Sequence, residues 1–285
     1  MLLKKKLKYL FVVSEYGSTN IILGLIKKYK IKKYNFYNID NKIDQKFLKK
    51  KISKNIFDRK FDYVVVGGSF LRKKNYELIS KFKKKKIKTA MIIDHWVGIE
   101  KKIDLKYIKK FPDFFWVTDY PFISKLKKKF KFNKFIQIND FYEKLIVKKI
   151  SSIKNNTANS VCFIDDPCTF AVKGKLLREL SIKNFFNLLR VKRAYHLNII
   201  VRPHPSMDSS FKNIYANFKD FKINFSKKNN SVEKDIKKTK FIVGIQSKLL
   251  KITRKAKYKT YTCLPLSYNK FNILNFENVK NLSLN

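Results

Sequence analysis

The sequence has little glycine, proline, cysteine or histidine, and it has no long apolar run. Its 285 residues include 7 Gly, 6 Pro, 3 Cys and 3 His. So little Gly and Pro excludes a collagen-like or low-complexity chain. Three Cys cannot all pair, and neither they nor the His residues have the spacing of zinc ligands, which excludes a disulfide scaffold and a zinc site. We expect no metal ion, no cofactor and a reducing, cytoplasmic environment.

No apolar stretch approaches the ~20 residues that a membrane span needs. The chain starts with the basic segment MLLKKK, and the apolar run after it, Leu7 to Val13, is interrupted by Lys8. No small-residue cleavage site follows, so this run is interpreted as the first strand of the fold and not as a signal peptide.

Acidic residues are also scarce, since 21 Asp and Glu face 66 Lys and Arg, for a net charge of +45. Such a charge would suit binding to nucleic acid. However, the basic residues are mostly Lys and are spread along the whole chain. This distribution is typical of an ordinary protein from an AT-rich genome, in which the many lysines lie solvated on exposed helix faces. We therefore do not expect a nucleic-acid partner, and the alternative is peripheral contact with an anionic membrane, at its inner face.

Hydrophobic residues make up 45% of the chain, enough for two cores. Short β-rich apolar runs alternate with lysine-rich amphipathic stretches, a pattern typical of parallel sheets covered by helices. Strands are expected at 9–13, 34–39, 63–66, 89–93, 114–117 and 135–138, then at 161–164, 198–201, 222–225, 241–244 and 259–263. Helices are expected at 20–29, 45–52, 75–84, 105–110, 121–130 and 140–147, then at 176–195, 211–218, 231–237 and 247–255.

The polar, turn-rich segment SSIKNNTANS separates the two series of strands. It predicts a linker at 151–160 between a first Rossmann-like domain, 1–150, and a second one, 161–285. The predicted fold class is α/β, with two Rossmann-like domains whose parallel sheets face a central cleft.

Ligands of open parallel sheets bind at the carboxyl ends of the strands. The segment VRPHPSMD follows an expected strand and contains Arg202 and His204, and Pro205 stiffens its loop. Arg and His side chains can both donate hydrogen bonds to a phosphate. The alternative is a histidine that only caps a neighbouring strand.

A second segment, FIVGIQSKLL, runs from an apolar strand through Gly244, Gln246 and Ser247 into a helix. Serine is a favoured N-cap, and the amides of a first helical turn bind anions. The alternative is that Ser247 only caps the helix.

A third segment, TAMIIDHWVG, is a buried strand that ends in Asp94 and His95. A carboxylate beside an imidazole can act as general base, or it can orient the imidazole that does so. The alternative is a hydrogen-bonded structural turn. Glu15 and the pair Asp165 and Asp166 follow other expected strands and are secondary candidates.

The sequence contains no dinucleotide fingerprint, P-loop, nucleophile elbow, H-E-x-x-H or D-x-D motif. RPHP at 202–205, VGIQS at 243–247 and a strand ending in CLP resemble the C-terminal half of bacterial GT-B glycosyltransferases of capsule and lipopolysaccharide biosynthesis. The sialyltransferase-like and polysaccharide-polymerising branch is the most similar. IDHW at 93–96 and FWVTD at 115–119 resemble the acceptor domain of the same group.

We interpret the chain as a transferase that moves a sugar from a CMP- or UDP-linked donor to a glycan or lipid-carrier acceptor, and the absence of D-x-D predicts that it needs no metal ion. The resemblance implies roles for three residues. His204 would contact the nucleotide phosphate, Pro205 would fix its loop, and Ser247 would hold the phosphate or the donor sugar. Two alternatives stay open: a sugar-nucleotide epimerase or hydrolase of the same fold, and a non-catalytic basic protein that binds anionic surfaces or nucleic acid.

Overall fold

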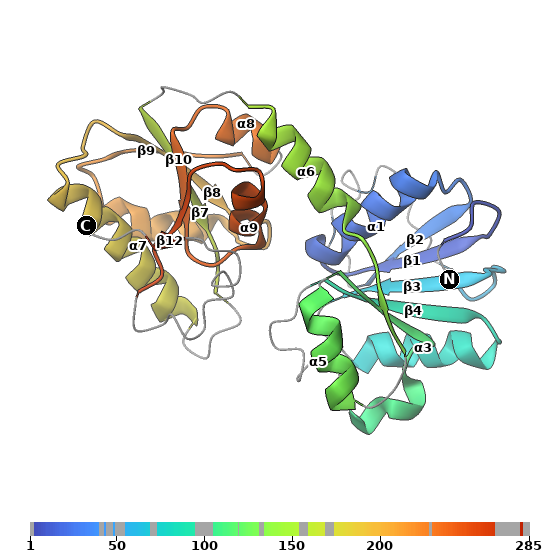
Figure 1. The fold of residues 1–285 in the computed structure, drawn as a ribbon. Helices are drawn as coiled ribbons and strands as arrows, with labels where there is room; N and C mark the ends of the chain where they lie inside the picture. The colour runs from blue at the N-terminus through green and yellow to red at the C-terminus, as the bar shows by residue number, and fades with distance from the viewer. Residues whose placement is uncertain are drawn as a thin grey trace. The chain divides into compact units, whose positions relative to one another are not determined.

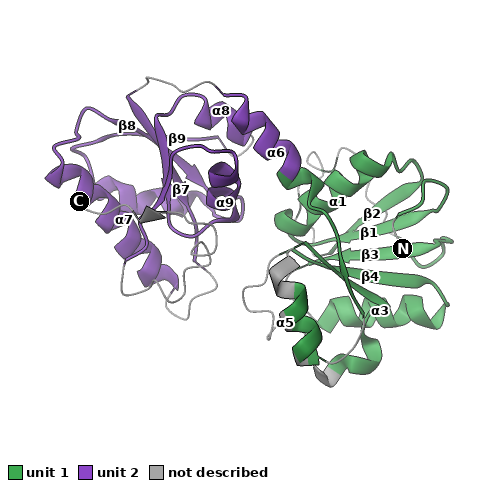
Figure 2. Ribbon diagram, in the orientation of Figure 1, with its two compact units in different colours: residues 1–143 green, residues 144–285 purple. Residues whose placement is uncertain are grey.

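The computed structural model describes residues 3–39, 43, 48, 55–68, 73–94, 105–118, 120–130, 134–153, 159–168, 174–227, 230–265 and 280–281. The chain divides into two compact units, residues 1–143 and 144–285 (Figure 2). The division falls inside helix α6 (Phe141–Ser151). The domain boundaries and linker given above stay predictions, and residues 154–158 of that linker lie outside the described residues.

Unit 1 contains a six-stranded parallel sheet with the strand order β2-β1-β3-β4-β5-β6 (Figure 1). The strands are β1 (Tyr9–Val13), β2 (Tyr34–Asn38), β3 (Tyr63–Gly67), β4 (Lys88–Ile93), β5 (Phe114–Val117) and β6 (Phe135–Gln137). Its helices are α1 (Tyr16–Tyr29), α3 (Lys73–Lys84), the 3-10 helix η2 (Leu105–Lys110) and α5 (Tyr120–Phe130), followed by α6. Most of the helix expected at 45–52 lies outside the described residues.

Alternate residues of the unit 1 strands enter two different cores. Leu10 and Val12 of β1 pack in the core that α3 covers, and Phe11 and Val13 pack in the core that α1 covers. Because helices bury both faces of the sheet, its inner strands are continuous apolar runs and do not alternate with polar residues. That is why the strands could be recognised in the sequence.

Unit 2 contains a second six-stranded parallel sheet, with the order β12-β11-β10-β7-β8-β9. Its strands are β7 (Ser160–Asp165), β8 (Asn198–Pro203), β9 (Lys222–Phe225), β10 (Phe241–Gly244), β11 (Thr260–Thr262) and β12 (Lys280–Asn281). The helices are α7 (Gly174–Val191), the 3-10 helix η3 (Ser209–Asn217), α8 (Val232–Ile236) and α9 (Lys248–Lys255). α7 and η3 cover one face of the sheet with buried aromatic side chains.

In each sheet the strand order reverses direction at one place. In unit 1 the chain moves outward from β1 to β2 and then continues on the other side with β3. In unit 2 it moves from β7 through β8 to β9 and then continues on the other side with β10. Ligands of such sheets bind at the carboxyl ends of the strands beside this switch point. The prediction of two Rossmann-like units with parallel sheets is confirmed.

Four connections after helices contain a basic residue in the left-handed conformation. These residues are Lys30, Lys86, Arg193 and Lys257, with φ between 50° and 60°. The backbone bonds around them are those of Schellman ends, for example from the amide of Ala194 to the carbonyl of Leu189. Glycine is the usual residue there, but a cation at the carboxyl end of a helix also interacts favourably with the helix dipole.

Among the described residues, no helix combines the length and the apolar character needed to cross a membrane.

Candidate functional site

The carboxyl edge of unit 2 brings together three residues from neighbouring strands. Asp165 of β7 pairs with Pro203 of β8, and Ile164 pairs with Gly244 of β10. His204, Asp166 and Gln246 follow these paired positions by one or two residues and form the row of residues that comes next at this edge. This row lies at the switch point between β7 and β10, where a ligand is expected.

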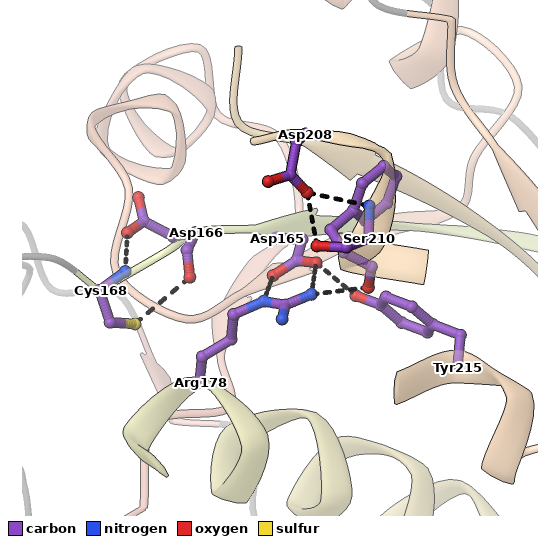
Figure 3. Close-up of polar contacts among 8 residues, drawn as sticks. Asp165, Asp166, Cys168, Arg178, Asp208, Ser210 and Tyr215 are labelled. Atoms are coloured by element: carbon purple, nitrogen blue, oxygen red, sulfur yellow. Dashed lines mark hydrogen bonds and ion pairs between the residues drawn. The ribbon is translucent and has the colours of Figure 1, made fainter. Parts of the chain in front are cut away.

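Asp165 lies beneath this row in a buried hydrogen-bonded network (Figure 3). Arg178 of α7 donates to both carboxylate oxygens, with distances of 2.8 Å from Nε to Oδ1 and 2.7 Å from Nη2 to Oδ2. The hydroxyl of Tyr215 in η3 donates to Oδ2 at 2.9 Å. Burial, reinforced by the charge of Asp165, raises the pKa of Tyr215, which keeps it a donor. This carboxylate therefore holds β7, α7 and η3 together and is not available for chemistry.

Asp166, one residue further along, has a different environment. Its Oδ1 accepts the backbone N–H of Cys168 at 2.9 Å, which fixes the orientation of the carboxyl group. Among the described residues, nothing donates to its Oδ2. Burial raises the pKa of Asp166 to about 7, since the opposing hydrogen bond from Cys168 does not offset it and the Asp165 charge adds to it. A secondary candidate in the sequence is thus the more suitable carboxyl group for proton transfer.

His204 presents one defined hydrogen-bond donor. Its backbone amide donates to the carbonyl of Asp165 at 3.0 Å, which extends the pairing of β8 with β7. Ring Nδ1 lies 3.2 Å from the backbone N–H of Ser206, which can only donate, and 2.7 Å from its hydroxyl. The proton of the neutral ring is therefore on Nε2. Burial lowers the pKa of His204, so the ring is neutral at pH 7 with Nε2–H as its donor.

Arg202 and Pro205 flank this histidine. The Arg202 guanidinium donates through Nη1 to Asp235 of α8 and through Nη2 to the carbonyl of Asn230, at 3.0 Å for the second bond. These bonds fix the side chain and use two of its five N–H donors. Pro205 is exposed in the turn after β8. A phosphate contact by Arg202 and a loop-stiffening effect of Pro205 stay predictions.

At the β10 side of the edge, the backbones of β10 and β7 lie very close together. A Cβ on Gly244 would lie 2.9 Å from the Ile164 carbonyl oxygen, so only glycine fits between β10 and β7. Gln246 is almost fully buried. Ser247 is the N-cap of α9, and its hydroxyl accepts the amide of Leu249 at 3.3 Å. The helix start thus faces the same edge as His204, and the capping role foreseen as an alternative for Ser247 is present.

Unit 1 has a second polar edge around Asp94, which follows β4 and is 7% exposed. A Cβ on Gly17 would stand 2.4 Å from Asp94 Oδ2, so the carboxylate lies against the first turn of α1. The positive end of the helix dipole stabilises its negative charge there. His95 lies outside the described residues, so its proposed partnership with Asp94 stays a prediction.

Asn75 of α3 is a residue that sequence reasoning missed. It is 2% exposed, and its amide Nδ2 has no hydrogen-bond partner in the described part of the chain. A Cβ on Gly68 would lie 3.0 Å from both Asn75 Nδ2 and Ser14 Oγ, which places the two polar atoms beside the β1/β3 switch point. Only the asparagine itself, unusual on a buried helix face, could have signalled this. Glu15, a secondary candidate, is the N-cap residue of α1 and makes no side-chain cap bond.

Among the described residues, no group of His, Cys, Asp or Glu side chains is placed to hold a metal ion. The three cysteines are buried and free. Burial raises the pKa of each thiol, so none is prepared to react as a thiolate.

Comparison with known proteins finds no matching family model and no matching curated protein. Solved structures do match. The UDP-GlcNAc 2-epimerase of Methanocaldococcus jannaschii is 13% identical over 90% of this chain and 83% of its own, with a TM-score of 0.56. Its complex with UDP-GlcNAc and UDP gives 12% identity, the same coverages and a TM-score of 0.64.

The UDP-GlcNAc 2-epimerase of Neisseria meningitidis bound to UDP-GlcNAc gives 10% identity over 90% of this chain and 82% of its own, with a TM-score of 0.56. Identities this low establish a similar fold and not a shared activity. The chain therefore has the GT-B-like fold of two Rossmann-like units.

Proposed function

We propose that this chain is an enzyme that acts on a nucleotide sugar and binds the nucleotide phosphates at the carboxyl edge of unit 2. The observation that carries the proposal is the row of His204, Asp166 and Gln246 at the β7/β10 switch point. His204 offers a neutral Nε2–H donor there, and α9 starts at the same edge. Support comes from the solved structures of similar fold, two of which hold UDP-GlcNAc.

The first candidate reaction is transfer of the sugar to a hydroxyl of a cell-surface glycan or a lipid-linked acceptor. Asp94 is then the general base that takes the proton of this hydroxyl, with His95 as its partner or its substitute. The first turn of α1 lies against the Asp94 carboxylate and holds it in place. His204, Arg202 and the first turn of α9 would stabilise the departing phosphate, so the proposed reaction uses no metal ion.

The second candidate is epimerisation or hydrolysis of the nucleotide sugar without an acceptor. It is favoured by the fact that the three solved structures compared above are all UDP-GlcNAc 2-epimerases. Product analysis with the nucleotide sugar alone separates the two candidates. Turnover of donor without any acceptor supports the second, and turnover only after an acceptor is added supports the first.

A thermal-shift panel of UDP, CMP, GDP and CDP tests the nucleotide site. A nucleotide that binds the folded state raises the melting temperature by mass action. We expect one of UDP and CMP to do so, and we expect His204→Ala to weaken its binding about tenfold, the effect of losing one hydrogen bond. The same variant should melt within a few degrees of the wild type, because the hydrogen bonds that the His204 ring makes within the described chain all go to Ser206 of its own loop, so none links it to another element.

No shift with any nucleotide, together with no turnover of UDP- or CMP-linked sugars, would contradict the proposal. It would leave the non-catalytic basic protein as the better reading of the net charge of +45. A cytoplasmic location stays a prediction. Peripheral contact with an anionic membrane is a second prediction, which binding to anionic vesicles tests. This binding should weaken as salt rises, because salt at physiological ionic strength screens charges over about 8 Å.

A further inference from the structure

The proposed function leaves one carboxyl group at the edge of unit 2 without a role. Asp165 and Asp166 are neighbours at the end of β7, yet only Asp165 is neutralised by an arginine. Asp165 accepts three hydrogen bonds from side chains of α7 and η3. Asp166 accepts one, from the backbone of Cys168. The first carboxylate is locked in the interior, and the second keeps an oxygen for another molecule.

The position of Asp166 is the one where a phosphate is expected. Its row contains the Nε2–H donor of His204 on the β8 side and Gln246, followed by the α9 cap, on the β10 side. The backbone of Cys168 lies against the start of α7, since a Cβ on Gly174 would stand 2.3 Å from the Cys168 carbonyl oxygen. With the Cys168 amide bonded to Oδ1, this contact orients the Asp166 carboxyl group at the edge.

We propose that Asp166 is a further catalytic residue, the general acid that protonates the phosphate oxygen as it leaves the sugar. This inference rests on the proposed function of unit 2. The bond between the sugar carbon and the phosphate oxygen breaks, and its electron pair stays on that oxygen. The Asp166 proton moves to the same oxygen, while the oxygen of the attacking hydroxyl forms the new bond to the sugar carbon and gives its proton to the general base. Exchange of one proton with water at each carboxyl group restores the enzyme.

The surroundings of Asp166 favour the protonated form that this step needs. Besides burial, the carboxylate of Asp165 raises the pKa of Asp166 and the hydrogen bond from the Cys168 amide lowers it, while the guanidinium of Arg178 is paired with Asp165. His204 faces it from β8 as a neutral ring, and β10 contributes only the uncharged Gln246. No described cation is left to stabilise an ionised Asp166, and its pKa of about 7 follows from burial. The acid can thus hold a proton near neutral pH and still release it.

The test is the pH dependence of turnover of UDP-GlcNAc and of a CMP-linked sugar, between pH 5.5 and 8.5, in wild type and Asp166→Asn. The wild-type rate should fall as the pH rises through about 7, where the acid loses its proton. Asp166→Asn should be at least about tenfold slower at pH 6 and should lose this decline, because an amide cannot transfer a proton. Affinity for UDP or CMP at pH 8.5 should be higher in the variant, since no carboxylate then repels the phosphate.

Asp220→Asn is the matched control, because Asp220 precedes β9 at the opposite edge of the same sheet and should keep the wild-type profile. Asp166→Ser, which keeps an acceptor for the Cys168 amide, shows whether any loss comes from the turn. A wild-type rate or an unchanged pH decline in Asp166→Asn overturns the inference while the proposed function stands. Failure of the wild-type protein to bind nucleotide or turn over either sugar overturns both.

Discussion

The two units present similar sheet edges but stabilise them in different ways. In unit 2, Arg178 with Asp165 and Arg202 with Asp235 form ion pairs whose side chains are almost entirely buried. The ion pairs among the described residues of unit 1, such as Lys83 with Asp113, lie nearer the surface. Its edge has close approach without such a pair, above all that of Gly17 to Asp94, whereas unit 2 combines its ion pairs with the close approach of Gly244 to Ile164.

Buried ion pairs and close packing around a carboxylate suit different functions. Buried ion pairs fix the direction of nearby donors, which suits recognition of a phosphate. Close packing around one carboxylate fixes its position and leaves little room for it to move, which suits a base. Under the proposed function, unit 2 would bind the nucleotide and unit 1 would carry the base, and the predictions below test that division.

The largest expected effect comes from breaking the ion pair beneath the edge of unit 2. Arg178→Met leaves Asp165 buried without a cation, which should lower the free energy of unfolding by about 3–5 kcal/mol. Arg190→Met is the control, because Arg190 forms the same two-bond pair with Asp220 at the surface, where solvent screens the charges, and its loss should be far smaller. Urea unfolding followed by circular dichroism measures both. Equal losses would show that burial of the pair is not what matters.

The corresponding change in unit 1 is Gly17→Ala, which should act on activity more than on stability. The new methyl group displaces the Asp94 carboxylate, while alanine favours the helix by about 1 kcal/mol. Turnover should fall about 10²–10⁴-fold, as for Asp94→Asn. The double variant should be little slower than either single one. If Asp94→Asn retains full activity, Asp94 is not the base, and His95→Ala becomes the next variant to measure.

The third effect is a pH dependence of stability, and it comes from Asp166, the carboxyl group at the end of β7 that Arg178 does not pair with. Folding raises the pKa of Asp166 from 3.8 to about 7, so between these values the folded state binds the proton more tightly than the unfolded state. Stability should therefore fall as the pH rises from about 4 to 7, by roughly 1–3 kcal/mol. Asp166→Asn removes this loss. Melting temperatures at pH 5 and pH 8 should differ less in the variant than in the wild type, and parallel curves would refute the assignment.

The smallest expected effect concerns the left-handed basic residues that follow helices in both units. Lys30→Gly in unit 1 and Arg193→Gly in unit 2 remove the strain of a left-handed residue with a side chain, and each should stabilise the protein by about 0.5–1 kcal/mol. Lys27→Gly, inside the last turn of α1, is the control and should destabilise it by about 1 kcal/mol. A loss of stability in Lys30→Gly would mean that its charge at the helix end outweighs the strain.

The strands were predictable because helices bury both faces of each sheet. The apolar run YLFVV corresponds to β1 without a shift, and the expected strand at 63–66 lacks only Gly67 of β3. The segment expected to be a helix at 211–218 is instead the 3-10 helix η3, which starts earlier, at Ser209. Its N-cap Asp208 accepts the amide of Ser210, a local signal that fixes where it begins.

The candidate site was predictable only where its residues follow strands in the sequence. Asp94, Arg202 and His204 were selected in this way, and the structure places them at or just after strand ends, while their roles stay predictions. The distinct roles of Asp165 and Asp166 depend on which one receives Arg178 and Tyr215, and those partners come from α7 and η3. No local pattern contains that information. The same holds for Asn75, whose unsatisfied amide is defined only once Gly68 and Ser14 stand beside it.

The described glycines of this chain lie where its segments make their tightest contacts. At each of the six glycines among the described residues, an added Cβ would stand 3.0 Å or less from another part of the chain. The four left-handed helix ends, where a side chain is strained but physically fits, are filled by lysine or arginine instead. This lysine-rich sequence thus has its few described glycines at positions where a larger residue does not fit. In such a protein a glycine points to where two segments touch: Gly17 and Gly68 lie at the polar edge of unit 1, and Gly244 lies at the edge of unit 2.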